Sequence, residues 1–135
     1  MPTPILIAED NRADLILVQE ALEKHGVNCR LFVAVDGEKA MQFLDQIDER
    51  AIPCPELIIL DLNLPKNSGY EVLARIRSRG LCMHTRVVIL SSAPGQRGEK
   101  ETAELRVSRY IQKPSRFDEY MQIGAELKSV LAEGR

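Results

Sequence analysis

The sequence lacks tryptophan, any long apolar run and any excess of basic residues. No stretch approaches the roughly 20 apolar residues of a membrane-spanning helix, so no segment is expected to cross a bilayer. The formal charge of -2, from 18 basic and 20 acidic residues, argues against nucleic acid as a direct partner. The opening residues, Met1 to Pro4, have no signal-peptide anatomy, and a cytoplasmic location is expected.

Cysteine and histidine are also scarce. Cys29, Cys54 and Cys82 are odd in number, far apart and without C-x-x-C spacing, which predicts free thiols rather than a zinc site or a disulfide. His25 and His84 have no second histidine or cysteine at metal-ligand spacing, so both are expected at the surface.

Short apolar runs predict five β-strands, at residues 5–8, 31–34, 57–60, 87–90 and 109–111. The third run, LIIL, does not alternate with polar residues, which is typical of a parallel strand buried on both faces. A loop with two prolines is expected over residues 48–56.

Helical periodicity and capping signals predict five helices between and after these strands. Three begin after the caps Asn11, Asp36 and Ser68, a weak one covers Pro94–Val107, and the last spans about residues 116–133. Alternating strands and helices indicate a doubly wound α/β fold with a five-stranded parallel sheet, as a single domain over residues 1–135.

Asp61 directly follows the LIIL strand and is the most informative residue. In open α/β sheets the carboxyl ends of the strands border the crevice where ligands bind. A carboxylate there could be a nucleophile, a metal ligand or only a turn residue.

Polar residues also follow three other strands: Glu9 and Asp10 the first, Ser91 the fourth and Lys113 the fifth. Because parallel strands end on the same side, these side chains are expected to converge with Asp61. Three carboxylates repel one another and need a cation, and hard oxygen ligands favour Mg²⁺. Lys113 adds positive charge and Ser91 a hydroxyl donor, which suits a phosphoryl group carried by Asp61.

With these residues in this order, the chain resembles the receiver domain of two-component response regulators from Ile5 to Leu131. The residues that carry the resemblance are Glu9-Asp10, Asp61, Leu64-Pro65, Gly69, Ser91, Tyr110 and Lys113-Pro114. The resemblance implies a flavodoxin-like fold with strand order 2-1-3-4-5.

The resemblance also implies roles at the acidic site. Asp61 is the implied phosphoacceptor, and Glu9, Asp10, Asp61 and the backbone carbonyl of Asn63 are the implied Mg²⁺ ligands. Glu9 stands where the family commonly has Asp, so a water-mediated metal contact is expected from its longer side chain.

Further roles are implied on the phosphoryl side. Lys113 is expected to pair with the phosphoryl oxygens and to precede Pro114 through a cis peptide bond. Ser91, in place of the commoner Thr, and Tyr110 are the implied switch pair. Gly69 is expected to let the chain turn tightly into the next helix.

Two alternatives use similar residues. An aspartate-nucleophile phosphatase also uses Asp, Mg²⁺, Ser or Thr, and Lys, but it needs a second acid two residues after the nucleophile, where this chain has Asn63. A flavin-binding module needs a phosphate-cradling loop after the first strand, where Glu9 and Asp10 would repel phosphate.

As a receiver, the protein is expected to take a phosphoryl group from a histidine kinase. The long loop before the third strand and the general character of the sequence resemble small regulators that pair with phytochromes, which suggests a phytochrome-type kinase. The expected output surface combines the Pro94–Val107 stretch, the Tyr110 strand and the last helix. Without an output domain after Arg135, a stand-alone regulator would signal through a downstream protein, a phosphotransfer partner or a homodimer.

Overall fold

The computed structural model describes residues 2–80, 82–92 and 106–133. In this part of the chain, five parallel strands form one sheet in the order β2-β1-β3-β4-β5, which confirms the predicted architecture. The strands are β1 (Thr3–Ala8), β2 (Cys29–Ala34), β3 (Leu57–Leu60), β4 (Arg86–Ser91) and β5 (Arg109–Gln112).

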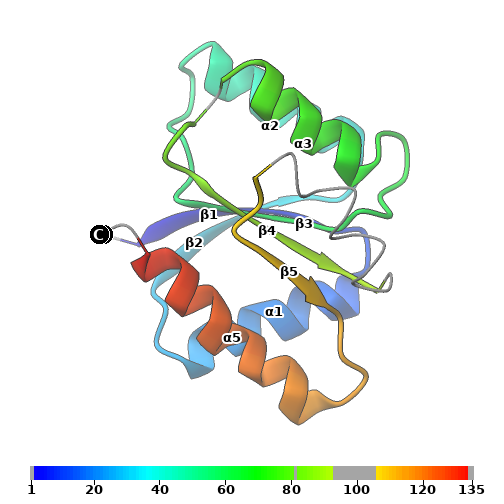
Figure 1. Cartoon of the computed structure of the whole chain (residues 1–135), viewed down its shortest axis with the longest axis vertical. Coiled ribbons are helices and arrows are strands. Elements are labelled where there is room, and N and C mark those ends of the chain that lie inside the picture. Colours follow the sequence, from blue (N-terminus) through cyan, green and yellow to red (C-terminus); the bar gives the residue numbers. More distant parts are fainter. Residues whose placement is uncertain (1, 81, 93–105, 134–135) are drawn as a thin grey trace.

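The described residues contain four helices rather than the five expected. They are α1 (Arg12–Lys24), α2 (Gly37–Asp48), α3 (Gly69–Ser78) and α5 (Phe117–Ala132). Helices α1 and α5 cover one face of the sheet and α2 and α3 cover the other (Figure 1). The helix predicted over Pro94–Val107 lies, except for its last two residues, outside the described residues.

Covering both faces explains why the central strands carry unbroken apolar runs. Ile5 and Ile7 of β1 pack on the α1–α5 side, whereas Leu6 and Ala8 pack on the α2–α3 side. Strand β3 alternates in the same way, and all four of its residues are buried. Side chains of successive strand residues point to opposite faces, so a strand between two helical layers needs apolar residues throughout.

The predicted helix caps are present. Asn11 accepts from the Asp14 N–H at 3.1 Å, and Asp36 accepts from the Lys39 N–H at 2.7 Å. Ser68 and Glu71 form a reciprocal capping box at the start of α3. Each cap satisfies backbone donors that the first turn of a helix leaves free.

Helices α1 and α5 pack unusually closely at Gly124. A Cβ atom at this position would lie 2.1 Å from the carbonyl oxygen of Ala21, so the backbones can approach only because the residue is glycine. His25 Nε2 lies 3.0 Å from the Met121 carbonyl oxygen, which half-buries His25 at this contact instead of leaving it on the open surface as expected. His84 is exposed, as expected.

A disulfide joins Cys54 and Cys82, so the prediction that all three cysteines are free thiols was wrong. The two residues are 28 positions apart, but each shortly precedes a strand. Because β3 and β4 pair in parallel with Leu57 opposite Arg86, the segments before them meet at the same edge. Cys29 remains a free thiol.

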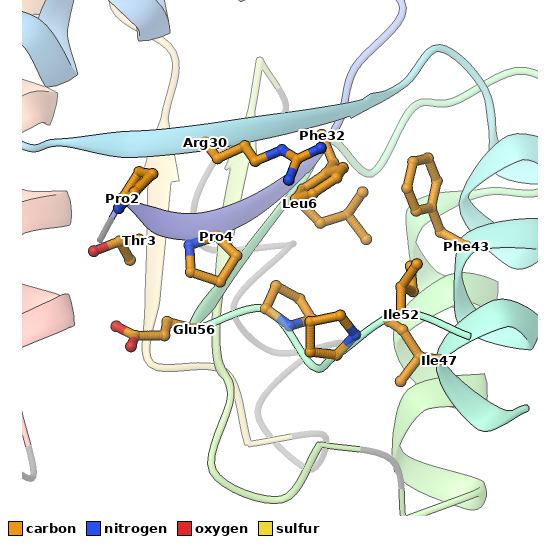
Figure 2. Close-up of a pocket in the computed structure, with 12 residues that line it drawn as sticks. Pro2, Thr3, Pro4, Leu6, Arg30, Phe32, Phe43, Ile47, Ile52 and Glu56 are labelled. Carbon is orange, nitrogen blue, oxygen red and sulfur yellow. The ribbon is translucent and has the colours of Figure 1, made fainter. Parts of the chain in front are cut away.

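A cavity of about 580 Å³ opens at the amino ends of the strands, away from the strand ends that carry the acidic residues. Its wall combines the start of β1, strand β2, helix α2 and the loop before β3 (Figure 2). Phe32 and Phe43 meet edge to face there, and the Arg30 guanidinium lies 4.9 Å from the Phe32 ring centre.

Among the residues described, no helix has both the length and the apolar character that a membrane crossing demands.

Candidate functional site

The carboxyl ends of β1, β3 and β5 bring Glu9, Asp10, Asp61 and Lys113 together. One carboxylate oxygen from each of Glu9, Asp10 and Asp61 lies within 4.8 Å of the others. Glu9 and Asp61 are buried, at 2% and 6% exposed, whereas Asp10 is open to solvent. The convergence that parallel topology predicts is therefore present for these four residues.

Lys113 is the cationic centre of this group. Its Nζ lies 2.6 Å from Glu9 Oε1, 2.8 Å from Asp14 Oδ2 and 3.0 Å from Asp61 Oδ2. Burial alone would lower the pKa of Lys113, but hydrogen bonds to Asp14, Glu9 and Asp61 outweigh burial and raise that pKa. Lys113 therefore carries a fixed positive charge at neutral pH.

Glu9 is held at both oxygens: Oε1 pairs with Lys113, and Oε2 accepts from the Asn11 N–H at 3.2 Å. Burial, with the nearby charge of Asp61, raises the pKa of Glu9 to about 7, although the Lys113 hydrogen bond acts in the opposite direction. Without a further cation, the Glu9 carboxylate is therefore partly protonated near neutral pH.

Asp61 is positioned by the backbone around it. Its N–H donates to the Ala8 carbonyl at 3.0 Å, which extends the β1–β3 pairing, and its Oδ1 accepts from the Asn63 N–H at 3.0 Å. Gly69 lies directly behind it, because a Cβ there would come within 2.3 Å of the Asp61 carbonyl oxygen. This close approach, at a residue without positive φ, is what requires glycine at the start of α3.

The predicted switch residues stand on the neighbouring strands β4 and β5. Ser91 is fully buried, and its carbonyl accepts from the Lys113 N–H at 2.7 Å. Tyr110 is partly buried against the core on the α2–α3 side. Their roles in a conformational switch stay a prediction, as does the role of the Asn63 carbonyl as a metal ligand.

The peptide bond between Lys113 and Pro114 is trans, since no cis bond occurs in the described ranges, and the expected cis bond was wrong. The trans isomer is intrinsically favoured by about 0.5–1 kcal/mol at such bonds. With this trans bond in the backbone, the Lys113 side chain reaches all three of its ion-pair partners.

Sequence reasoning missed two members of the group, Asp14 and Tyr120. The Tyr120 hydroxyl donates to Asp14 Oδ1 at 3.1 Å, while the other oxygen of Asp14 binds Lys113. Neither residue directly follows a strand, and neither is among the residues that carry the resemblance to receiver domains. An acid six residues from a strand end gives no signal by itself, because its meeting with Lys113 depends on how α1 packs.

The donor set fits a divalent cation. Glu9, Asp14 and Asp61 contact the one ammonium group, and Asp10 lies beside Glu9 and Asp61, so the site carries excess negative charge when the four acids are ionised. Three of the four present hard oxygen atoms close to one another, an arrangement that suits ions such as Mg²⁺ or Mn²⁺.

A family model described as the response regulator receiver domain matches residues 5–124. The chain belongs to this family. Receiver domains are the signalling domains of two-component systems, and the fold and acidic strand ends described above are those of such a domain.

Several relatives of this receiver domain are similar over nearly their whole length. Response regulator Rcp1 of Synechocystis sp. (strain ATCC 27184 / PCC 6803 / Kazusa) is 36% identical, over 98% of this chain and 90% of that protein. The phosphorylated cyanobacterial phytochrome response regulator RcpA has a TM-score of 0.87 at 36% identity, covering 100% of this chain and 98% of RcpA. The Mn²⁺-bound form of Rcp1 has a TM-score of 0.85 at 35% identity, and the match covers 99% of this chain and 97% of the Rcp1 chain.

Proposed function

We propose that Asp61 accepts a phosphoryl group from the phosphohistidine of a partner histidine kinase in a Mg²⁺-dependent transfer. The observation that carries this proposal is the position of Asp61: a buried carboxylate at the end of a central strand, 3.0 Å from a lysine and within a cluster of acids. In the transfer the P–N bond of the donor breaks and a P–O bond to Asp61 forms.

The metal would be held by Glu9, Asp10, Asp61 and the backbone carbonyl of Asn63. It would neutralise negative charge as the phosphoryl group approaches the carboxylates. The Mn²⁺-bound form of Rcp1 supports divalent-metal binding by this chain.

The chain's own side chains supply the rest of the site. Lys113 holds a positive charge beside Asp61 Oδ2, where it can pair with a phosphoryl oxygen. Ser91, at the end of β4, supplies a hydroxyl for another oxygen. A phosphoryl group adds about -1.5 to -2 of charge, and we infer that Ser91 and Tyr110 respond to it.

The response would change the surface of β5 and α5, and the signal would leave by protein contact or homodimerisation. The expected output surface also includes residues 94–107, of which 94–105 lie outside the described residues. Rcp1, which aligns over 90% of its length, supports a stand-alone regulator, and the phytochrome response regulator RcpA supports a phytochrome-type kinase as partner. We also propose a cytoplasmic location. In that compartment Cys54 and Cys82 would be kept reduced.

Intact-mass spectrometry after incubation with acetyl phosphate and Mg²⁺ tests the proposal. We expect a single phosphoryl adduct that is absent with EDTA and absent in Asp61→Asn, while Asp118→Asn, which changes an exposed carboxylate on α5, keeps it. Multiple turnover of a phosphomonoester would support the phosphatase alternative, and an adduct that persists in Asp61→Asn would contradict Asp61 as the acceptor.

A further inference from the structure

The carboxylate of Asp14 is held from two sides. Its Oδ2 lies 2.8 Å from the Lys113 ammonium, and its Oδ1 accepts from the Tyr120 hydroxyl at 3.1 Å. The contacts join α1, the end of β5 and α5. The Asp14 side chain is 17% exposed and Tyr120 is 3% exposed, so both contacts are sheltered from solvent.

The support beneath this contact is closely packed. Tyr120 and Gly124 lie one helical turn apart on α5, and Gly124 allows α5 to rest against the α1 backbone at Ala21. The N–H of Asp14 is itself bonded to the Asn11 side chain. Asp14 therefore presents its carboxylate to Lys113 from a fixed platform between two packed helices.

Asp14 differs from the other two acids that bind Lys113. Glu9 and Asp61 belong to the cluster that can hold a metal ion, whereas Asp14 does not. A metal ion or a phosphoryl group would therefore compete with Lys113 for Glu9 and Asp61. Among the three acids described in contact with Lys113, Asp14 is the one that neither the metal ion nor the phosphoryl group would displace.

We propose that Asp14, oriented by Tyr120, is a positioning residue that anchors the Lys113 ammonium beside Asp61 before, during and after phosphorylation. This inference rests on the proposed function. It assigns a role to Asp14 and Tyr120, which are not among the residues that carry the resemblance. A free lysine side chain has many rotamers, and restricting them to one costs conformational entropy. An anchor outside the reacting group removes that cost from the transfer step.

Phosphorylation kinetics test the anchor. At saturating acetyl phosphate and Mg²⁺ we expect Asp14→Asn to lower the rate constant about tenfold and Tyr120→Phe about three- to fivefold, with little change in the donor concentration at half-saturation. Glu20→Gln, which alters an exposed carboxylate on the same helix, is the matched control and should leave the rate unchanged. An unchanged or faster rate in both Asp14→Asn and Tyr120→Phe would overturn the proposal.

A double-mutant cycle separates anchoring from a general structural role. If Asp14 acts through Lys113, Asp14→Asn should slow the wild-type protein but add no further loss in a Lys113→Ala background. An equal loss in both backgrounds would show that Asp14 acts by another route, and the proposal would fail.

Lysine-ammonium NMR provides a readout that needs no phosphoryl transfer. We expect a protected Nζ resonance of Lys113 in the wild type, with and without Mg²⁺, and its loss by fast exchange in Asp14→Asn and Tyr120→Phe. A resonance that both variants retain would contradict the anchor. If the wild type shows this resonance but takes no phosphoryl group, the anchor stands and the proposed function fails.

Discussion

The ammonium of Lys113 lies 2.6 Å from a carboxylate oxygen of Glu9, so the ends of β5 and β1 are joined by a buried ion pair. Burial, and after it the charge of Asp61, raises the pKa of this carboxylate to about 7, and the hydrogen bond from Lys113 offsets only part of that rise. Stability in the absence of metal should therefore depend on the protonation of Glu9.

We expect the free energy of unfolding in EDTA to fall as pH rises from about 5 to about 8. The folded-state pKa of Glu9 is raised, so its contribution is fully present below the unfolded value of 4.5 and is lost as pH rises through about 7. The loss should be on the order of 1–3 kcal/mol, measured by urea unfolding at a series of pH values. In Glu9→Gln this part of the pH dependence should disappear, and an identical profile in wild type and variant would contradict the account.

Gly124→Ala should destabilise the fold by about 1–3 kcal/mol, although the same change in an exposed helix is stabilising. The added Cβ would lie 2.1 Å from the Ala21 carbonyl oxygen and 2.6 Å from His25 Cδ2, so the helices must separate. Chemical unfolding measures the loss, with Ser129→Ala on the exposed side of α5 as control. A Gly124→Ala protein as stable as the wild type would show that α1 and α5 do not pack this closely.

Reducing the Cys54–Cys82 bond should lower the free energy of unfolding by about 3.5 kcal/mol, because the bond closes a segment of 28 residues. Unfolding with and without dithiothreitol measures the change. Cys54→Ser should abolish the response to reductant, whereas Cys29→Ser should retain it. A wild-type unfolding curve that reductant does not move would show that the bond does not form in solution.

Much of the fold follows from local sequence patterns. The run LIIL, the caps Asn11, Asp36 and Ser68, and the alternation of strands with helices predict the elements and the parallel sheet that the structure shows. Parallel strands also end on one side, so the meeting of Glu9, Asp61 and Lys113 follows from topology alone.

What could not be predicted depends on packing between distant segments. Cys54 and Cys82 meet because β3 and β4 pair in a particular register, which cysteine spacing does not encode. Asp14 reaches Lys113 because α1 and α5 pack closely at Gly124. The trans bond before Pro114 also has no local signature, since both isomers are open to a prolyl bond.

The most direct test of the account is to locate the phosphoryl group. After treatment with acetyl phosphate and Mg²⁺, borohydride reduces an acyl phosphate of aspartate to homoserine, which leaves a permanent mass change at the modified residue. Peptide mass spectrometry should find homoserine at position 61, none in the EDTA sample and none in Asp61→Asn. Homoserine at another position, or none in the wild type with Mg²⁺ present, would contradict the assignment of Asp61 as the phosphoacceptor.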